Sequence, residues 1–160
     1  RFAPDENVRR YHGGGRTLEG VEDGFVLTTY GTMRLDADHF ESVRWGLLVA
    51  DEAQHVKNPR SAGAKALRTI PARSRVALTG TPVENNLSEL WAILDWTTPG
   101  LLGSHAQFRK KWADPIELEM KEKTTKLLSK LVRPLLIRRR KSDPGIAPEL
   151  PPKTDRKSAV

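Results

Sequence analysis

A short apolar run that ends in two adjacent carboxylates constrains this 160-residue chain more than any other feature. Residues 47–50 read Leu-Leu-Val-Ala, and Asp51 and Glu52 follow directly. A run this apolar and this short predicts a strand buried on both faces, as in a parallel sheet. Open α/β sheets bind ligands beyond the carboxyl ends of their strands, so we expect the acidic pair at a binding edge. Two carboxylates there need a metal ion, a water to be activated or a basic partner to offset their desolvation.

Adjacent carboxylates at such an edge suit the hydrolysis of a nucleoside triphosphate. Asp51 is assigned to Mg²⁺, through its water shell, because a carboxylate commonly helps to hold the ion that bridges the phosphates. Glu52 is assigned to the attacking water, which it would orient and deprotonate. The alternative is a strand that stops at a solvated acidic turn, and the Asp-Glu pair alone does not decide between the two.

The composition permits a basic, globular domain. Hydrophobic residues make up 38% of the chain and charged residues 29%, and no apolar run approaches the roughly 20 residues of a membrane span. The formal net charge of +7 favours a polyanionic partner, of which nucleic acid is the usual one. Cysteine is absent, which excludes disulfides and thiolate metal sites and is compatible with a reducing cytoplasm. Because the first residue is Arg1 rather than Met, we expect a segment cut from a longer protein.

Strand and helix signals alternate along the chain. A helix is expected to begin near Thr32, and a polar connection over 36–44 leads into the central strand. Apolar residues at 127, 128, 131 and 132 predict a further helix that ends at Arg133-Pro134. Strands are expected near residues 8–11, 25–30, 45–50, 75–78 and 135–137.

Capping signals place three more helices. Asn58 as N-cap with Pro59 in the first turn predicts a helix that Pro71 stops. Asn86 with Glu89, and Ser104 with Gln107, each resemble a capping box. The helix after Ser104 is expected to break at 114–115, and the charged stretch 117–125 is expected to be exposed.

A second strand tip repeats the design of the first. The apolar run 75–78 ends in Thr79-Gly80-Thr81-Pro82, and in a parallel sheet this tip would share an edge with Asp51 and Glu52. The alternative is an ordinary strand-to-helix turn. The glycine triplet at 13–15 is read as a flexible turn, because the phosphate-loop pattern G-x-x-x-x-G-K-S/T occurs nowhere in the chain.

In this order, the motifs resemble the first motor lobe of the SWI/SNF-type ATPases, the chromatin-remodelling and bacterial DNA-translocase branch of helicase superfamily two. The resemblance covers nearly the whole chain. DEAD-box RNA helicases, by contrast, are expected to carry Ser-Ala-Thr in place of Thr79-Gly80-Thr81. The matching segments are Phe2-Ala3-Pro4, 26–30, Asp51-Glu52-Ala53-Gln54 with Val56-Lys57-Asn58, 78–82 with 85–86 and 89–91, 136–139 with 141–143, and 150–153.

This resemblance implies roles for the two tips in an intact motor that uses ATP and Mg²⁺. Asp51 would help to hold Mg²⁺, and Glu52 would be the general base. Thr79, Gly80 and Thr81 would couple hydrolysis to movement of the lobes. Gln54 stands where many relatives have His, and it could still link the Walker B box to the third motif by hydrogen bonds, without titrating.

The resemblance also implies DNA contacts, each with a simpler alternative. Thr28, Thr29 and Tyr30 would meet the DNA backbone, unless this strand end only packs in the sheet. Lys57 and Asn58 would approach DNA, unless Asn58 only caps a helix. The basic runs 138–141, which includes Arg138 and Arg139, and 109–111 are candidate phosphate contacts or solvated faces. The four tryptophans are expected in the core.

We therefore expect an α/β fold of three layers, with a parallel sheet flanked by helices, as part of a RecA-like (P-loop NTPase) lobe. The lobe would span residues 1–141, with a helical protrusion at about 101–130 and a linker at 142–160 toward a second lobe. The Walker A lysine would lie before Arg1, so the fragment alone is expected to be inactive. The expected function is ATP-driven translocation on double-stranded DNA and remodelling of DNA-bound protein complexes, in the cytoplasm at a bacterial nucleoid rather than in a nucleus, and away from membranes. The alternatives are a non-catalytic basic module that binds nucleic acid or protein, and an RNA helicase of the DEAx type.

Overall fold

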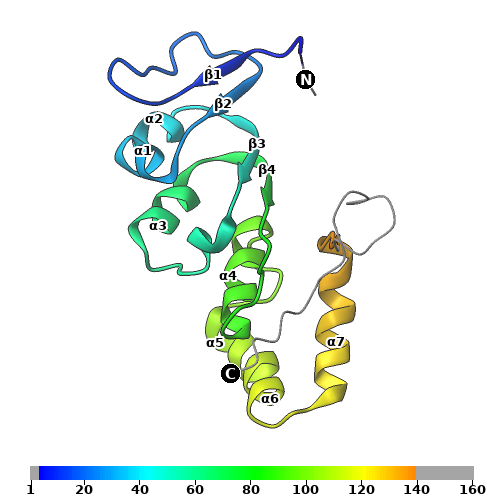
Figure 1. Cartoon of the computed structure of the whole chain (residues 1–160). Helices are drawn as coiled ribbons and strands as arrows, with labels where there is room; N and C mark the ends of the chain where they lie inside the picture. Colours follow the sequence, from blue (N-terminus) through cyan, green and yellow to red (C-terminus); the bar gives the residue numbers. More distant parts are fainter. Residues whose placement is uncertain (1–3, 140–160) are drawn as a thin grey trace, which may run out of the picture. The chain divides into compact units, whose positions relative to one another are not determined.

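The computed structural model describes residues 4–139, and the chain divides into two compact units, Arg1–Met120 and Lys121–Val160. Expectations for 140–160, including the linker, lie outside the described residues. Within residues 4–120, the first unit has four short strands and six α-helices (Figure 1). Its elements are β1 (Val8–Arg10), β2 (Phe25–Leu27), α1 (Tyr30–Leu35), α2 (Ala37–Glu41), β3 (Trp45–Ala50), the 3₁₀-helix η1 (Ala53–Val56), α3 (Ala62–Thr69), β4 (Ala72–Ala77), α4 (Leu87–Thr97), α5 (His105–Phe108), the π-helical turn η2 (Arg109–Ala113) and α6 (Asp114–Glu117).

The described strands pair in parallel, as predicted, but they form two separate pairs. β1 pairs with β2 in the register Val8 to Phe25. β3 pairs with β4 from Trp45 opposite Ala72 to Ala50 opposite Ala77. Helix α3 connects β3 to β4, which makes a β-α-β unit of the kind that parallel pairing requires.

One hydrophobic core joins the sheets to the first helices. Tyr11, Phe40, Ile70 and Trp96 are at most 4% exposed in it. The ring of Tyr11 meets Phe40 edge-on with centroids 4.9 Å apart, a favourable aromatic geometry. Trp96 comes from α4, whose burial on nearly all sides ties this helix to the same core.

The β3–β4 pair is covered on one face only within residues 4–139. Leu48 is half-buried and Ala50 is 3% exposed, whereas Leu47 and Val49 are about half exposed (51% and 49%). In Figure 1, α1, α2 and α3 lie on one side of this pair. Successive side chains of a strand point to opposite faces, so half of the apolar run remains uncovered. The prediction of a strand buried on both faces is wrong for the described part of the chain.

Helix α3 begins later than predicted, because Ser61 and not Asn58 caps it. Asn58 Oδ1 accepts from the amide of Arg60, which makes a turn rather than a cap. Ser61 is the actual N-cap, because its hydroxyl accepts from the amide of Ala64. The predicted polar connection over 36–44 was also wrong in part, since α2 forms there with Phe40 buried.

The predicted break at 114–115 is also absent. The chain stays helical from α5 through η2 into α6, and Pro115 lies in the first turn of α6. A π-helical turn before a proline relaxes the demand for the i to i−4 hydrogen bond that proline cannot make. The capping box of Ser104 and Gln107 at the start of this segment is confirmed, with both of its hydrogen bonds present.

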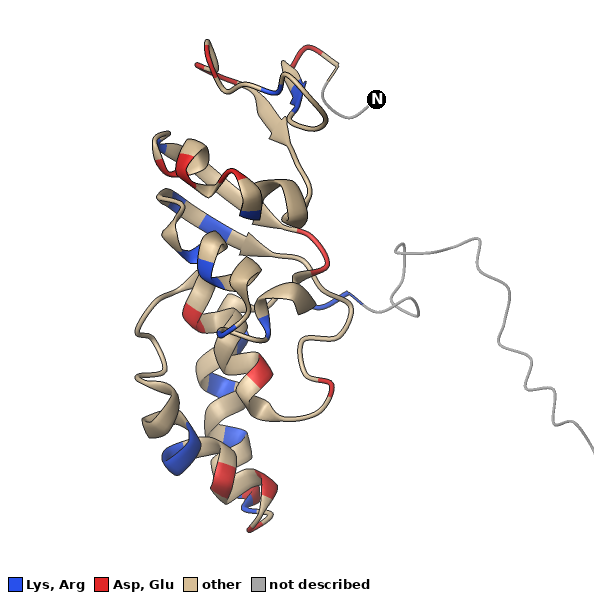
Figure 2. Cartoon of the chain, turned by 90° about the vertical axis from the view of Figure 1, so that its left-hand side faces the viewer, with Lys and Arg blue, Asp and Glu red and all other residues tan. Residues whose placement is uncertain are grey.

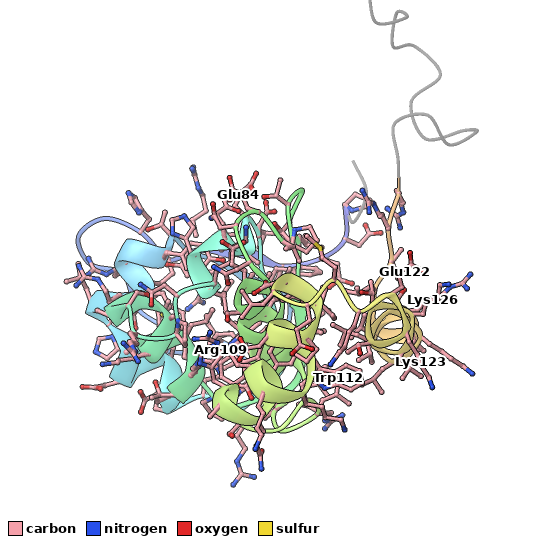
Figure 3. The ribbon with its side chains drawn as sticks, turned by 90° about the horizontal axis from the view of Figure 1, so that it is seen from below. Glu84, Arg109, Trp112, Glu122, Lys123 and Lys126 are labelled. Carbon is pink, nitrogen blue, oxygen red and sulfur yellow. The ribbon has the colours of Figure 1, made fainter. Side chains whose placement is uncertain are left out.

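The second unit contains α7 (Glu122–Val132) and the 3₁₀-turn η3 (Arg133–Leu135). The predicted helix and its end at Arg133 are confirmed. The predicted strand over 135–137 is wrong, because Leu135 belongs to η3 and no strand follows it up to residue 139. Figure 3 shows Lys123 and Lys126 extending away from the axis of α7. No helix in the described residues is long and apolar enough to cross a membrane.

Candidate functional site

The two polar strand tips lie side by side, joined through the main chain of Leu78. The amide of Leu78 donates to the carbonyl of Ala50 over 2.8 Å. The amide of Ala53 donates to the carbonyl of Leu78 over 2.9 Å. The parallel ladder therefore continues past both strands and spans the acidic pair at 51–52. The two strand ends therefore share one edge of the sheet, as predicted. We call this edge, formed by residues 51–52 and 79–82, the shared rim.

Glu52 stands at the turn of this rim in an unusual backbone conformation. Its φ of 47° and ψ of 55° are left-handed, and Met120 is the only other non-glycine residue with positive φ in the described chain. The left-handed conformation costs a residue with a Cβ roughly 1–2 kcal/mol. Asp51 stabilises the turn, since its Oδ1 accepts from the amide of Glu52 over 2.9 Å. Both acidic side chains are exposed, so they are accessible to a ligand at the rim.

Tyr30 reaches the acidic turn from the start of α1. Its hydroxyl donates to the carbonyl oxygen of Asp51 over 2.7 Å. Its ring lies against the imidazole of His55, with centroids 4.6 Å apart. Burial, and then the negative charges of Asp51 and Glu52, raise the pKa of Tyr30 to about 12. The hydroxyl is therefore a neutral donor at physiological pH.

Gln54 lies on η1 directly after the acidic turn, and its side chain is exposed. Within residues 4–139 it makes no side-chain hydrogen bond to the third motif. Its role as a link between the two motifs stays a prediction. Thr79 makes a local turn instead, because its hydroxyl accepts from the amide of Thr81 over 3.2 Å.

Lys57 is the centre of a polar cluster beside the rim. Its ammonium lies 3.2 Å from Glu84 and 3.1 Å from Glu89, and only 9% of its side chain is exposed. Glu89 also accepts from the side chain of Asn85 and the amide of Glu84, each over 2.7 Å. The cluster therefore ties the loop that follows the Thr-Gly-Thr-Pro tip to η1.

The hydrogen bonds and ion pairs of this cluster stabilise the charged forms of Glu89 and Lys57. Burial alone would raise the pKa of Glu89, but hydrogen bonds from Asn85, Glu84 and Lys57 outweigh it and lower that pKa to about 2. Burial alone would lower the pKa of Lys57. Its bonds to Glu89 and Glu84 raise that pKa by more than burial lowers it, so the net shift is upward. Sequence analysis missed this cluster and wrongly gave Glu89 a role in a capping box. Asn86 is the N-cap of α4, as predicted, but its oxygen accepts from Ser88 and Glu89 bonds elsewhere.

The residues predicted to meet DNA are placed by several elements. Thr28 is exposed, whereas the hydroxyl of Thr29 caps α1 by accepting from the amide of Thr32. Asn58 is exposed in its turn, and the ammonium of Lys57 is engaged by carboxylates. Thr28, Thr29 and Asn58 are all exposed, and the Thr29 hydroxyl is engaged by the cap. Their contact with DNA stays a prediction.

The two basic runs differ in their surroundings. Arg109 pairs with Asp114 over 3.0 Å, and Lys111 lies 5.0 Å from the ring centre of Trp112 (both Arg109 and Trp112 are labelled in Figure 3). Arg138 and Arg139 are exposed in the second unit, and the rest of their run lies outside the described residues. Figure 2 shows basic residues spread over several elements and interspersed with acidic ones.

The rim fits a Mg²⁺ ion that arrives with a nucleotide. Within residues 4–139 there is no cluster of three or more His, Asp and Glu side chains that could hold a metal ion. Mg²⁺ usually keeps several waters and uses only one or two carboxylates together with phosphate oxygens. Asp51 offers such a carboxylate at an exposed strand end.

A parallel β-α-β unit whose strands end side by side, one in an acidic turn and one in Thr-Gly-Thr-Pro, is the arrangement expected of part of a RecA-like ATPase core. The family model for the SNF2-related domain matches residues 17–160, and the chain belongs to this family. The class predicted from the sequence is thereby confirmed.

Relatives of this chain include both bacterial and eukaryotic proteins. The chain is 39% identical over 165 residues to YwqA of Bacillus subtilis, whose name describes an ATP-dependent helicase or translocase. The match covers 99% of this chain and 18% of that protein. The chain is 36% identical to the chromatin-remodeling ATPase INO80 of Schizosaccharomyces pombe over 74% of this chain and 8% of that protein. The chain thus spans less than a fifth of the length of these relatives.

A solved structure shares the fold. The SWI2/SNF2 ATPase core of Sulfolobus solfataricus in complex with double-stranded DNA superposes with a TM-score of 0.80 and 37% identity. The match covers 93% of this chain and 31% of that one. A second structure, of the Sulfolobus solfataricus SWI2/SNF2 ATPase core domain, superposes with a TM-score of 0.74 and 35% identity.

Proposed function

We propose that this chain is part of an ATP-dependent translocase that moves on double-stranded DNA and remodels the protein complexes bound to it. The observation that carries the proposal is the shared rim, where the main chain of Leu78 bonds on both sides of Asp51 and Glu52. The DNA-bound ATPase core with 37% identity supports the DNA partner. The lobe at 1–141, the protrusion at 101–130, the linker at 142–160 and a place at a bacterial nucleoid are parts of the same proposal.

The acidic turn supplies the chemistry of ATP hydrolysis in this proposal. Asp51 would hold Mg²⁺ through water, and the ion would supply charge neutralisation for the phosphates of bound ATP. Glu52 orients a water and accepts its proton, which typically contributes a factor of about 10²–10⁴ in rate. A change at Thr79 to Thr81 reaches Glu52 through the bonds of Leu78.

DNA is bound mainly through its phosphates in this proposal. The chain has 27 Lys and Arg against 20 Asp and Glu, an excess that favours a polyanion. Thr28, Asn58, Arg138 and Arg139 have exposed side chains that can donate to phosphate oxygens. Thr29, Tyr30 and Lys57 are held by the protein itself, so we propose that they act by shaping this surface.

An ATPase assay on the full-length protein that carries this chain tests the proposal. We expect double-stranded DNA to stimulate hydrolysis, and Glu52→Gln to remove the stimulated rate by a factor of about 10²–10⁴. Glu41→Gln is the matched control, because Glu41 is an exposed carboxylate on α2. The 160 residues alone contain no P-loop lysine pattern, so we expect no turnover from them.

Two outcomes would overturn the proposal. Hydrolysis that survives Glu52→Gln would remove the base from the mechanism. A full-length protein that binds DNA without stimulated hydrolysis would instead support the non-catalytic basic module, for which the net charge of +7 is the supporting observation. Stimulation and unwinding by RNA alone would support an RNA helicase.

A further inference from the structure

The hydroxyl of Tyr30 and the carboxylate of Asp51 together fix the peptide group that orients Glu52. Asp51 Oδ1 accepts from the N–H of this peptide over 2.9 Å. Tyr30 donates to its carbonyl oxygen, which belongs to Asp51, over 2.7 Å. Both polar groups of the peptide between residues 51 and 52 are therefore engaged. Because a peptide is planar, its carbonyl and N–H turn together, and a flip of this peptide would change the φ angle of Glu52.

Holding this peptide matters because Glu52 is in a costly conformation. A residue with φ of 47° can relax to negative φ if the preceding peptide flips. The bond from Tyr30 opposes that flip, since a flip would turn the carbonyl away from the hydroxyl. The direction in which the Glu52 carboxylate leaves the main chain thus depends on Tyr30.

The main chain of Tyr30 follows directly after the strand end that is predicted to meet DNA. β2 ends at Leu27, Thr28 and Thr29 follow, and α1 begins at Tyr30. The hydroxyl of Thr29 caps α1 by accepting from the amide of Thr32. Tyr30 follows Thr29 directly and lies inside this capped turn, so we expect a displacement of Thr28 and Thr29 to be passed to Tyr30.

We propose that Tyr30 is a positioning residue that couples DNA contact at Thr28 to the orientation of the general base Glu52. This coupling rests on the proposed function. Packing alone would need only the ring, which lies against His55 and which phenylalanine would reproduce. The hydroxyl is the part that the coupling needs.

The test compares the two tyrosines of the chain in the full-length protein. Tyr30→Phe removes the bond to the carbonyl of Asp51. Tyr11→Phe is the matched control, because it removes a hydroxyl that bonds to Asp36 and His39 instead. We expect Tyr30→Phe to lower the DNA-stimulated kcat about 3- to 10-fold, as for one hydrogen bond, with the KM for ATP and the DNA affinity unchanged.

A second readout follows the turn directly. In amide hydrogen exchange, the amide of Glu52 should exchange faster in Tyr30→Phe than in the wild type or Tyr11→Phe, at similar thermal midpoints. Wild-type stimulation and wild-type exchange in Tyr30→Phe would overturn the coupling and leave the proposed function standing. A wild type without DNA-stimulated hydrolysis would overturn the proposed function, and the coupling with it, whatever the exchange rates.

Discussion

The ammonium of Lys57 lies 3.1 Å from the carboxylate of Glu89, with 9% and 11% of the two side chains exposed. This pair joins the segment after the acidic turn to α4, 32 residues further along the chain. Removing one member of a buried pair leaves the other charge uncompensated, which is strongly destabilising. The pair therefore stabilises the fold around the site, whatever its part in DNA binding.

Lys57→Met should destabilise the chain by about 3 kcal/mol, because Glu89 would stay buried without its cation. Lys126→Met is the matched control, since Lys126 pairs with Glu122 at 3.8 Å with both side chains more than four-fifths exposed. The control should change stability by less than about 0.5 kcal/mol. Urea unfolding measures both, and equal losses would contradict the structural role of the Lys57 pair.

Stability should also fall in acid through Glu89. Its pKa is lowered from 4.5 to about 2 in the folded chain, so its contribution is complete above pH 4.5 and is lost as the pH falls toward 2. Glu89→Gln has no carboxylate to protonate and should show a shallower loss of unfolding free energy between pH 5 and pH 2. Denaturant unfolding across this range measures the two slopes, and parallel slopes would show that Glu89 is not the group responsible.

Glu52 should be a site where stability and activity are opposed. Glu52→Gly relieves the left-handed strain and should be about 1 kcal/mol more stable than Glu52→Gln, which keeps the strain. Both variants lack the carboxylate and should lack DNA-stimulated hydrolysis. Urea unfolding and the ATPase assay separate the two effects, and a Gly variant less stable than the Gln variant would argue against strain at this turn.

The helical segment from α5 to α6 should depend on its cap. Ser104→Ala removes the oxygen that accepts from the amide of Gln107 and should cost about 1 kcal/mol. Ser129→Ala is the control, because Ser129 is exposed within α7 and alanine favours helices. The control should be neutral or slightly stabilising in thermal unfolding. An equal loss in both variants would mean that the cap contributes nothing specific.

Features encoded by near neighbours could be predicted from the sequence. The caps at Asn86 and Ser104 and the end of α7 at Arg133 depend on side chains within four residues, and all three were found. The parallel rim followed from two apolar runs with polar ends. Where two neighbouring residues could both cap, as at Asn58 and Ser61, the sequence alone pointed to the wrong one.

Features set by distant or backbone contacts could not be predicted. The pairing of Lys57 with Glu89 joins residues far apart in sequence. The positive φ of Glu52 is imposed by its surroundings on a residue type that does not favour it. Pro115 continued a helix because a π-helical turn preceded it, and no residue in 109–113 signals such a turn. The assigned roles of Asp51, Gln54 and Thr79 stay predictions until they are measured.

The bonds of Leu78 have a consequence for how the link between the two strand ends can be studied by mutation. They run from its amide and its carbonyl, so the link between the two strand tips contains no side-chain atom of this residue. An alanine scan would pass over this connection, since truncating Leu78 leaves both bonds in place. An amide-to-ester replacement at this position would sever the first bond while keeping the side chain, and would expose a mechanical connection that ordinary mutagenesis misses.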